Sequence, residues 1–260
     1  MRTTLFVVVV LAGCLAKRQP IGVSRPPPAQ PANPNPAPAP GQEPPPAGTA
    51  DVPIDPARQM PAESLSTRAQ LELARPVLVV VDGRSDIFSS GLPTSDPNRG
   101  GRLPALLGLV AGGGYITFNK VKGVVGCMAG ATTPPDGGRC AGGNTNIRPA
   151  NGISGIVNHD HSQFLVGVFL TPDVSRTAPP TLDFSSNAKG EAFAELAPQI
   201  GQTFFIGDGF TPTGLLQRFL VPAGATRLYL AFADAAAFQG DPGSYEDNTG
   251  GLHVTLMQQQ

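Results

Sequence analysis

Residues 221–232 read VPAGATRLYLAF and carry the clearest structural signal in the chain. Turn-forming residues at 222–224 are followed by alternating apolar side chains, Leu228, Leu230 and Phe232. A period of two places these side chains on one face of a β-strand. The same period recurs near the end of the chain, in Leu252, Val254 and Leu256. The two segments therefore predict strands that each bury one face.

Further short apolar runs, separated by Gly, Pro, Asn and Asp, precede these two segments. With them, the predicted strands are Val77–Val81, Tyr115–Val121, Phe164–Leu170, Thr203–Ile206, Gln217–Val221, Arg227–Phe232 and Gly251–Met257. Such a series predicts an all-β domain over residues 74–260, a jelly-roll-like sandwich of about 7–9 antiparallel strands. One short helix is expected at Glu191–Ala197, stopped by Pro198.

The loop from Asp234 to Gly250 contains four carboxylates and no Lys or Arg. The carboxylates belong to Asp234, Asp241, Glu246 and Asp247. If they converge, their repulsion has to be offset, and Ca²⁺ does so because it takes several oxygen ligands. The loop therefore indicates a calcium site. The competing interpretation is an acidic hairpin loop solvated by water.

Three motifs in the carboxy-terminal third point to a family. They are FFIGDG at 204–209, VPAGATRLYLAF at 221–232 and YEDNTG at 245–250. Together they resemble the calcium-dependent galactose-binding lectin domains of the PA-IL (LecA) type. They also resemble related domains of exported bacterial proteins. The similarity is strongest over residues 203–257 and extends over 112–170. It implies a β-sandwich that binds Ca²⁺ and carbohydrate.

The resemblance also implies a ligand set for the ion. Side-chain oxygens would come from Asp234, Asp247 and Asn248, and backbone carbonyl oxygens from Ser244 and from a residue near Cys127. The loop after Asp234 is longer than in the lectins, so Asp241 competes with Asp234 for the place of the first ligand.

A sugar would bind through the ion, and the expected contacts are Asp136, Asp234, Tyr245, Asp247 and Asn248. Tyr245 stands where an aromatic platform could lie, and the chain has no Trp. Two functions follow as alternatives. One is a carbohydrate-binding surface protein, and the other is a structural or adhesive envelope protein whose calcium is purely stabilising.

The amino terminus reads as a secretion signal. Arg2 precedes an apolar stretch from Leu5 to Leu11, which is too short to span a bilayer. Residues 11–14, LAGC, resemble the lipobox of bacterial lipoproteins, which implies cleavage after residue 13 and a lipid on Cys14. The competing interpretation of the apolar stretch is a buried strand.

Cysteine parity agrees with a lipidated Cys14. The chain has three cysteines, and lipidation of Cys14 leaves Cys127 and Cys140 to pair in an oxidising compartment. The alternative is two reduced cysteines in a cytoplasmic protein.

Residues 14–73 are predicted to form a disordered tether. About half of the 29 prolines lie before residue 60, with few large apolar residues, and such a segment cannot bury a core. We therefore expect a lipid-anchored protein of the cell envelope, held away from the membrane. Leu15, in place of an aspartate after the lipidated residue, favours the outer membrane of a Gram-negative bacterium.

Other chemistry has weaker support in the sequence. The formal net charge of −1 provides no basic field for nucleic acid. His159 and His161, with His253, could be zinc ligands, but a solvated turn is the better interpretation of the pair. No nucleophile elbow or phosphate-binding loop is present. The sequence therefore predicts a binding protein and not an enzyme.

Overall fold

The strands predicted from the sequence are all present. The structure is a computed structural model, and it describes residues 75–260 except 110–112, 129, 174 and 176. The predicted signal peptide, the lipidated Cys14 and the tether to residue 73 lie outside the described residues. Within them the domain is all-β, as expected, and no helix there is long and apolar enough to cross a membrane.

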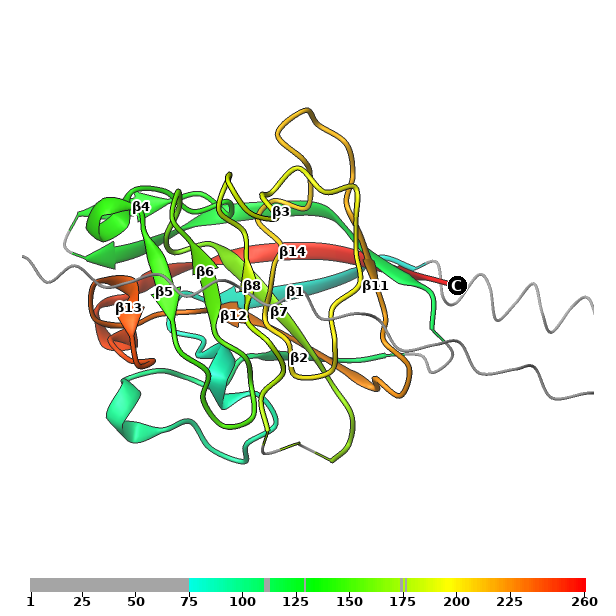
Figure 1. The fold of residues 1–260 in the computed structure, drawn as a ribbon, viewed down its shortest axis with the longest axis horizontal. Helices are drawn as coiled ribbons and strands as arrows, with labels where there is room; N and C mark the ends of the chain where they lie inside the picture. Colours follow the sequence, from blue (N-terminus) through cyan, green and yellow to red (C-terminus); the bar gives the residue numbers. More distant parts are fainter. Residues whose placement is uncertain (1–74, 110–112, 129, 174, 176) are drawn as a thin grey trace, which may run out of the picture. The chain divides into compact units, whose positions relative to one another are not determined.

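Fourteen strands are formed by the described residues, seven of them predicted (Figure 1). The predicted ones are β1 (Val77–Asp82), β3 (Tyr115–Met128), β7 (Leu165–Leu170), β10 (Phe204–Phe205), β11 (Arg218–Leu220), β12 (Arg227–Phe232) and β14 (Thr249–Gln259). The additional ones have two to four residues each: β2 (Ala105–Gly108), β4 (Ala131–Thr133), β5 (Thr145–Ile147), β6 (Ile156–Asn158), β8 (Leu182–Asp183), β9 (Glu195–Leu196) and β13 (Gln239–Gly240).

The strands form three sheets. The largest has the order β1-β14-β3-β11-β9, with β4 paired to β3. The second has the order β10-β7-β12-β2, and the third, β13-β5-β6-β8, contains only short strands. Most pairs are antiparallel, and β9 with β11, β13 with β5 and β6 with β8 are parallel.

The alternation in β14 matches the sequence. Leu252, Val254 and Leu256 are buried, whereas His253 between them is exposed. In β12 the predicted face is buried too, but so are Tyr229 and Ala231 on the other face. This strand lies between β7 and β2 and is covered on both sides, so the chain that leaves it starts from the interior.

An aromatic column joins the two larger sheets. Phe219 of β11 lies 5.3 Å, between ring centroids, from Phe118 of β3 and also 5.3 Å from Phe204 of β10. Phe204 in turn stacks on Phe169 of β7 at 5.1 Å. Because β11 and β10 belong to different sheets, these contacts make the pair a β-sandwich with a shared core.

The prediction of a helix at Glu191–Ala197 is wrong. Glu195 and Leu196 form β9, which pairs in parallel with Arg218 and Phe219. Phe193 packs on the ring of Phe219 at 5.9 Å. Tertiary pairing overrides the helical propensity here, because a segment this short gains little from helix formation alone.

The predicted disulfide is confirmed. Cys127 near the end of β3 is bonded to Cys140, which begins a 3-10 turn (Cys140–Gly142), and their Cα atoms are 6.3 Å apart. Both residues are buried, with Phe238 beside them. The bond therefore ties the end of the longest strand to the loop that follows β4.

We predict that Phe219→Ala removes a large part of the stability of the domain. The ring is fully buried at the centre of the aromatic column, and such truncations cost about 3–5 kcal/mol. Denaturant unfolding measures this change. Leu215→Ala is the control, because Leu215 is 60 % exposed and should shift stability by less than about 0.5 kcal/mol. Equal effects of the two substitutions would contradict the proposed core.

Candidate functional site

Asp234 is a buried carboxylate at the end of β12. Only 2 % of the residue is exposed, and it follows a run of buried residues, Leu228 to Ala233. One carboxylate oxygen accepts from the backbone N–H of Ala235 and the other from Nδ2 of Asn248, each at 2.7 Å. Burial raises the pKa of Asp234 to about 8 despite these two hydrogen bonds. In the absence of a counter-ion, the site therefore favours the protonated acid.

Tyr245 holds the loop against the strand end. Its hydroxyl donates to the carbonyl oxygen of Phe232 and accepts from the N–H of Asp234, both at 3.1 Å. The ring is fully buried. The expectation that Tyr245 offers an aromatic face to a sugar is therefore corrected, because no face of the ring reaches solvent.

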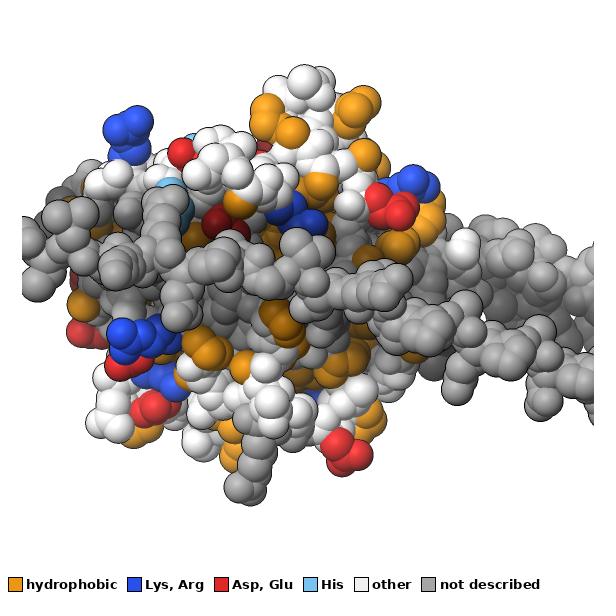
Figure 2. Space-filling model, in the orientation of Figure 1, with side chains coloured by type: hydrophobic (Ala, Val, Ile, Leu, Met, Phe, Trp, Pro, Cys, Tyr) orange, Lys and Arg blue, Asp and Glu red, His pale blue; other side chains and the backbone are white. Residues whose placement is uncertain are grey.

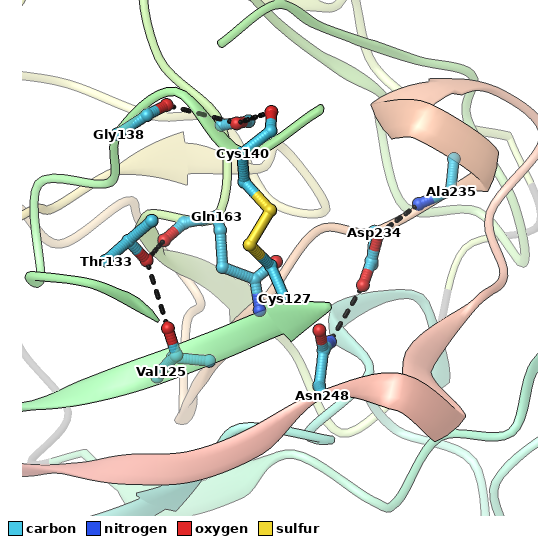
Figure 3. The surroundings of a disulfide bond; sticks show 10 residues. Val125, Cys127, Thr133, Gly138, Cys140, Gln163, Asp234, Ala235 and Asn248 are labelled. Atoms are coloured by element: carbon cyan, nitrogen blue, oxygen red, sulfur yellow. Dashed lines mark hydrogen bonds between the residues drawn. A yellow bond between two sulfur atoms is a disulfide. The ribbon is translucent and has the colours of Figure 1, made fainter. Parts of the chain in front are cut away.

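Asn248 completes a pair with Asp234. It directly precedes β14, whose first residue, Thr249, pairs with Gly126 of β3. Asn248 consequently lies beside Cys127 at the same end of the sheet, as Figure 3 shows. The residue is 2 % exposed, and its Oδ1 has no hydrogen-bond partner. A buried amide oxygen without a partner is costly, and it is an atom that a cation would coordinate.

The other acidic residues of the loop lie further out. The residue Asp247 is exposed, but partial desolvation of its carboxyl, together with the charge of Glu246, raises its pKa. The negative charges of Asp247 and Glu246 add slightly to the raised pKa of Asp234. Asp241 is exposed and pairs with Arg148 at 3.3 Å. Of the two rivals, Asp234 and not Asp241 is therefore the residue inside this site.

Ser244 lies at the turn into the last part of the loop, and its backbone is in the left-handed region, with φ 67°. The N–H of the preceding Gly243 donates to the carbonyl oxygen of Asp234. This contact folds the loop back over the strand end.

The three histidines do not gather. His159 contacts Asn144, His161 contacts Glu191, and His253 is exposed on β14. Among the described residues no group of three or more His, Cys, Asp or Glu is arranged to hold a metal ion. A cation at Asp234 would therefore depend on amide and backbone oxygens.

Asp136 lies in a different place, in a hollow of about 520 Å³. Its Oδ1 accepts from the N–H of Asp208 at 2.7 Å, and burial raises the pKa of its carboxyl. The remaining lining residues are His161, Glu191, Phe205, Asp208, Phe210, Thr211, Pro212 and Gly214. The sequence linked Asp136 to a sugar but did not indicate this set of neighbours.

His161 and Glu191 form the polar centre of this hollow. Nδ1 of the ring lies 2.7 Å from Oε1 of Glu191, and this contact raises the pKa of the imidazole. A second hollow of about 420 Å³ adjoins the first and shares both residues and Pro212. This pair is not evident from the sequence, which predicts a helix at Glu191, whereas the residue lies in an irregular segment.

Two segments that line the hollow are joined to each other. Gly138 and Ser162 form an antiparallel bridge that joins the segment of Asp136 to the segment of His161. The two segments approach so closely that a Cβ atom at Gly137, where φ is 79°, would lie 2.4 Å from the carbonyl oxygen of Ser162.

On the face shown in Figure 2, the acidic and basic side chains of the described residues are interspersed. Comparisons with protein-family models, with curated proteins and with solved structures found no match to this chain. The lectin resemblance therefore rests on the quoted motifs and remains a prediction.

We predict that, without metal, Asp234→Asn flattens the loss of stability with rising pH. The folded pKa of Asp234 lies above its unfolded value, so the folded state binds the extra proton and wild-type stability falls between about pH 4 and pH 8. The asparagine variant lacks this loss and should be more stable than wild type at pH 8, by up to several kcal/mol. Denaturant unfolding in a chelator at several pH values tests this, and parallel curves for the two proteins would contradict it.

Proposed function

We propose that this protein is an exported, lipid-anchored protein of the cell envelope whose β-sandwich binds calcium at Asp234 and Asn248. The observation that carries the proposal is a buried carboxylate, Asp234, beside Asn248, whose buried amide oxygen has no hydrogen-bond partner. Calcium prefers carboxylate and amide oxygens and neutralises the charge that burial disfavours.

The competing interpretation, an acidic loop solvated by water, accounts for the outer half of the loop only. Asp241 and Glu246 are exposed, whereas Asp234 and Asn248 are each 2 % exposed. Zinc fits less well, because the site offers no imidazole or free thiolate.

Export has support that is independent of the amino-terminal motif. The disulfide between Cys127 and Cys140 suits an oxidising compartment. Lipidation at Cys14 would then anchor the chain to a membrane, and residues up to 73 would act as the tether, with the outer membrane as the proposed location.

We predict that calcium raises the melting temperature of the wild-type protein at pH 7 and that Asp234→Ala removes this response. The ion binds the folded state only, so stability rises with the logarithm of its concentration above the Kd. Thermal unfolding with calcium and with a chelator measures the effect. Asp241→Asn is the matched control and should respond like wild type, because Asp241 faces solvent beside Arg148. A calcium response that survives Asp234→Ala and is lost in Asp241→Asn would reassign the site.

Carbohydrate binding is the second candidate, and the hollow around Asp136 favours it. Carboxylates, an imidazole and the ring of Phe205 line a space large enough for a small ligand. Direct bridging of a sugar to the ion is less favoured, because Asp234 and Asn248 are buried. In this version calcium acts indirectly, by stiffening the chain near the hollow.

We predict chelator-sensitive binding on a glycan array, lost in His161→Ala and in Asp136→Ala. Both side chains line the hollow and both would hydrogen-bond sugar hydroxyls. Asp241→Asn again serves as the control. If the folded, calcium-loaded protein binds no glycan, the structural role of calcium remains and carbohydrate binding is rejected.

A further inference from the structure

Gln163 is a buried amide whose hydrogen-bonding capacity is unused. The residue is 1 % exposed, and neither Oε1 nor Nε2 has a partner. Among the described residues it is the only buried amide side chain left without a partner at both polar atoms. Leaving such groups unsatisfied costs free energy on folding, so a position that retains one calls for a ligand.

The backbone places Gln163 at the same end of the sandwich as Asn248. Its carbonyl oxygen accepts from Oγ1 of Thr133 at 3.0 Å, and the same hydroxyl approaches the carbonyl oxygen of Val125 on β3 at 3.4 Å. Val125 pairs with Gly250, and Asn248 lies two residues before Gly250. A positive φ of 56° at Gln163 turns the chain just before β7.

The side chain of Gln163 points into the candidate site. In Figure 3 it runs beside the disulfide, and its amide is directed toward the space between Cys127 and Asn248, with Asp234 beyond. Three unpartnered polar atoms therefore belong to this one region: both polar atoms of Gln163 and Oδ1 of Asn248. The disulfide lies next to them as a rigid wall.

We propose that Oε1 of Gln163 is a third side-chain ligand of the cation, together with Asp234 and Asn248. This inference rests on the proposed calcium site. It gives a partner to the amide oxygen, and a water in the coordination shell of calcium would accept from Nε2. The ion then joins three segments that are distant in the sequence: the turn before β7, the end of β12 and the start of β14.

This ligand set also predicts the range of affinity. One buried carboxylate and two neutral amides carry little negative charge. Calcium sites bind more weakly when their ligands carry fewer negative charges. We therefore expect a Kd on the order of 10⁻⁴–10⁻³ M, the range of extracellular calcium modules. A protein outside the cytoplasm meets calcium at such concentrations.

The test is calcium titration of the full chain by calorimetry, with unfolding curves in a chelator. Gln163→Leu should weaken calcium binding at least about tenfold. Without metal it should be as stable as wild type or more stable, since the unsatisfied amide is gone. Gln163→Glu should bind calcium at least as tightly as wild type and be less stable without it, because a second carboxylate then faces Asp234.

Gln217→Leu is the matched control. Gln217 is also fully buried with an unpartnered Oε1, but its Nε2 donates to the carbonyl oxygens of Glu191 and Phe193, so it belongs to another part of the core. Its loss should lower stability and leave the calcium Kd unchanged.

The outcomes separate the two proposals. If wild type binds no calcium, the calcium site itself fails. If wild type binds calcium and Gln163→Leu binds equally well, the assignment of Gln163 is overturned and the site at Asp234 stands. Should Gln163→Leu fail to fold, Gln163→Glu decides, because weaker calcium binding by a folded glutamate variant would overturn the assignment.

Discussion

A carboxylate at the end of a strand covered on both sides is the constraint on which this structure depends. Asp234 is 2 % exposed, because it follows the buried strand β12 and the buried Tyr245 holds the loop over the end of that strand. Such a group must be protonated or be paired with positive charge. Among the residues that the structure describes, the one side chain hydrogen-bonded to its carboxylate is the neutral amide of Asn248. A calcium ion supplies the missing charge, and the unpartnered amide oxygens nearby are the ligands that it prefers.

The sandwich positions these groups through contacts made elsewhere. The aromatic column around Phe219 fixes the two larger sheets against each other, and the disulfide fixes the end of β3 beside Asn248. The segment that carries Gln163 also carries His161, which lines the hollow of Asp136. An ion held by Gln163 would therefore order one wall of that hollow. This arrangement gives a physical route by which carbohydrate binding could depend on calcium without contact between sugar and ion.

The seven strands that the sequence predicts have a clear period of two or a run of large apolar residues. The strands it missed, such as β8 and β13, are too short to show a period, and their existence depends on pairing with distant segments. The prediction of a helix at 191–197 was wrong because that segment, too, takes its structure from pairing with a distant strand, β11. The composition of the acidic loop indicated a cation. It could not show that Asp234 is buried and Asp241 exposed, because this depends on how the preceding strands, β12 and β13, are placed. Gln163 carried no sequence signal, since a single glutamine before a strand is ordinary.

A crystal structure of the protein grown with calcium decides whether buried oxygens near the end of β12 surround a calcium ion. We expect a density peak bonded to oxygen atoms of Asp234 and Asn248, and to Oε1 of Gln163, at about 2.3–2.6 Å. A structure at millimolar calcium without such a peak, in which Nδ2 of Asn248 still donates to a protonated Asp234, would contradict the account.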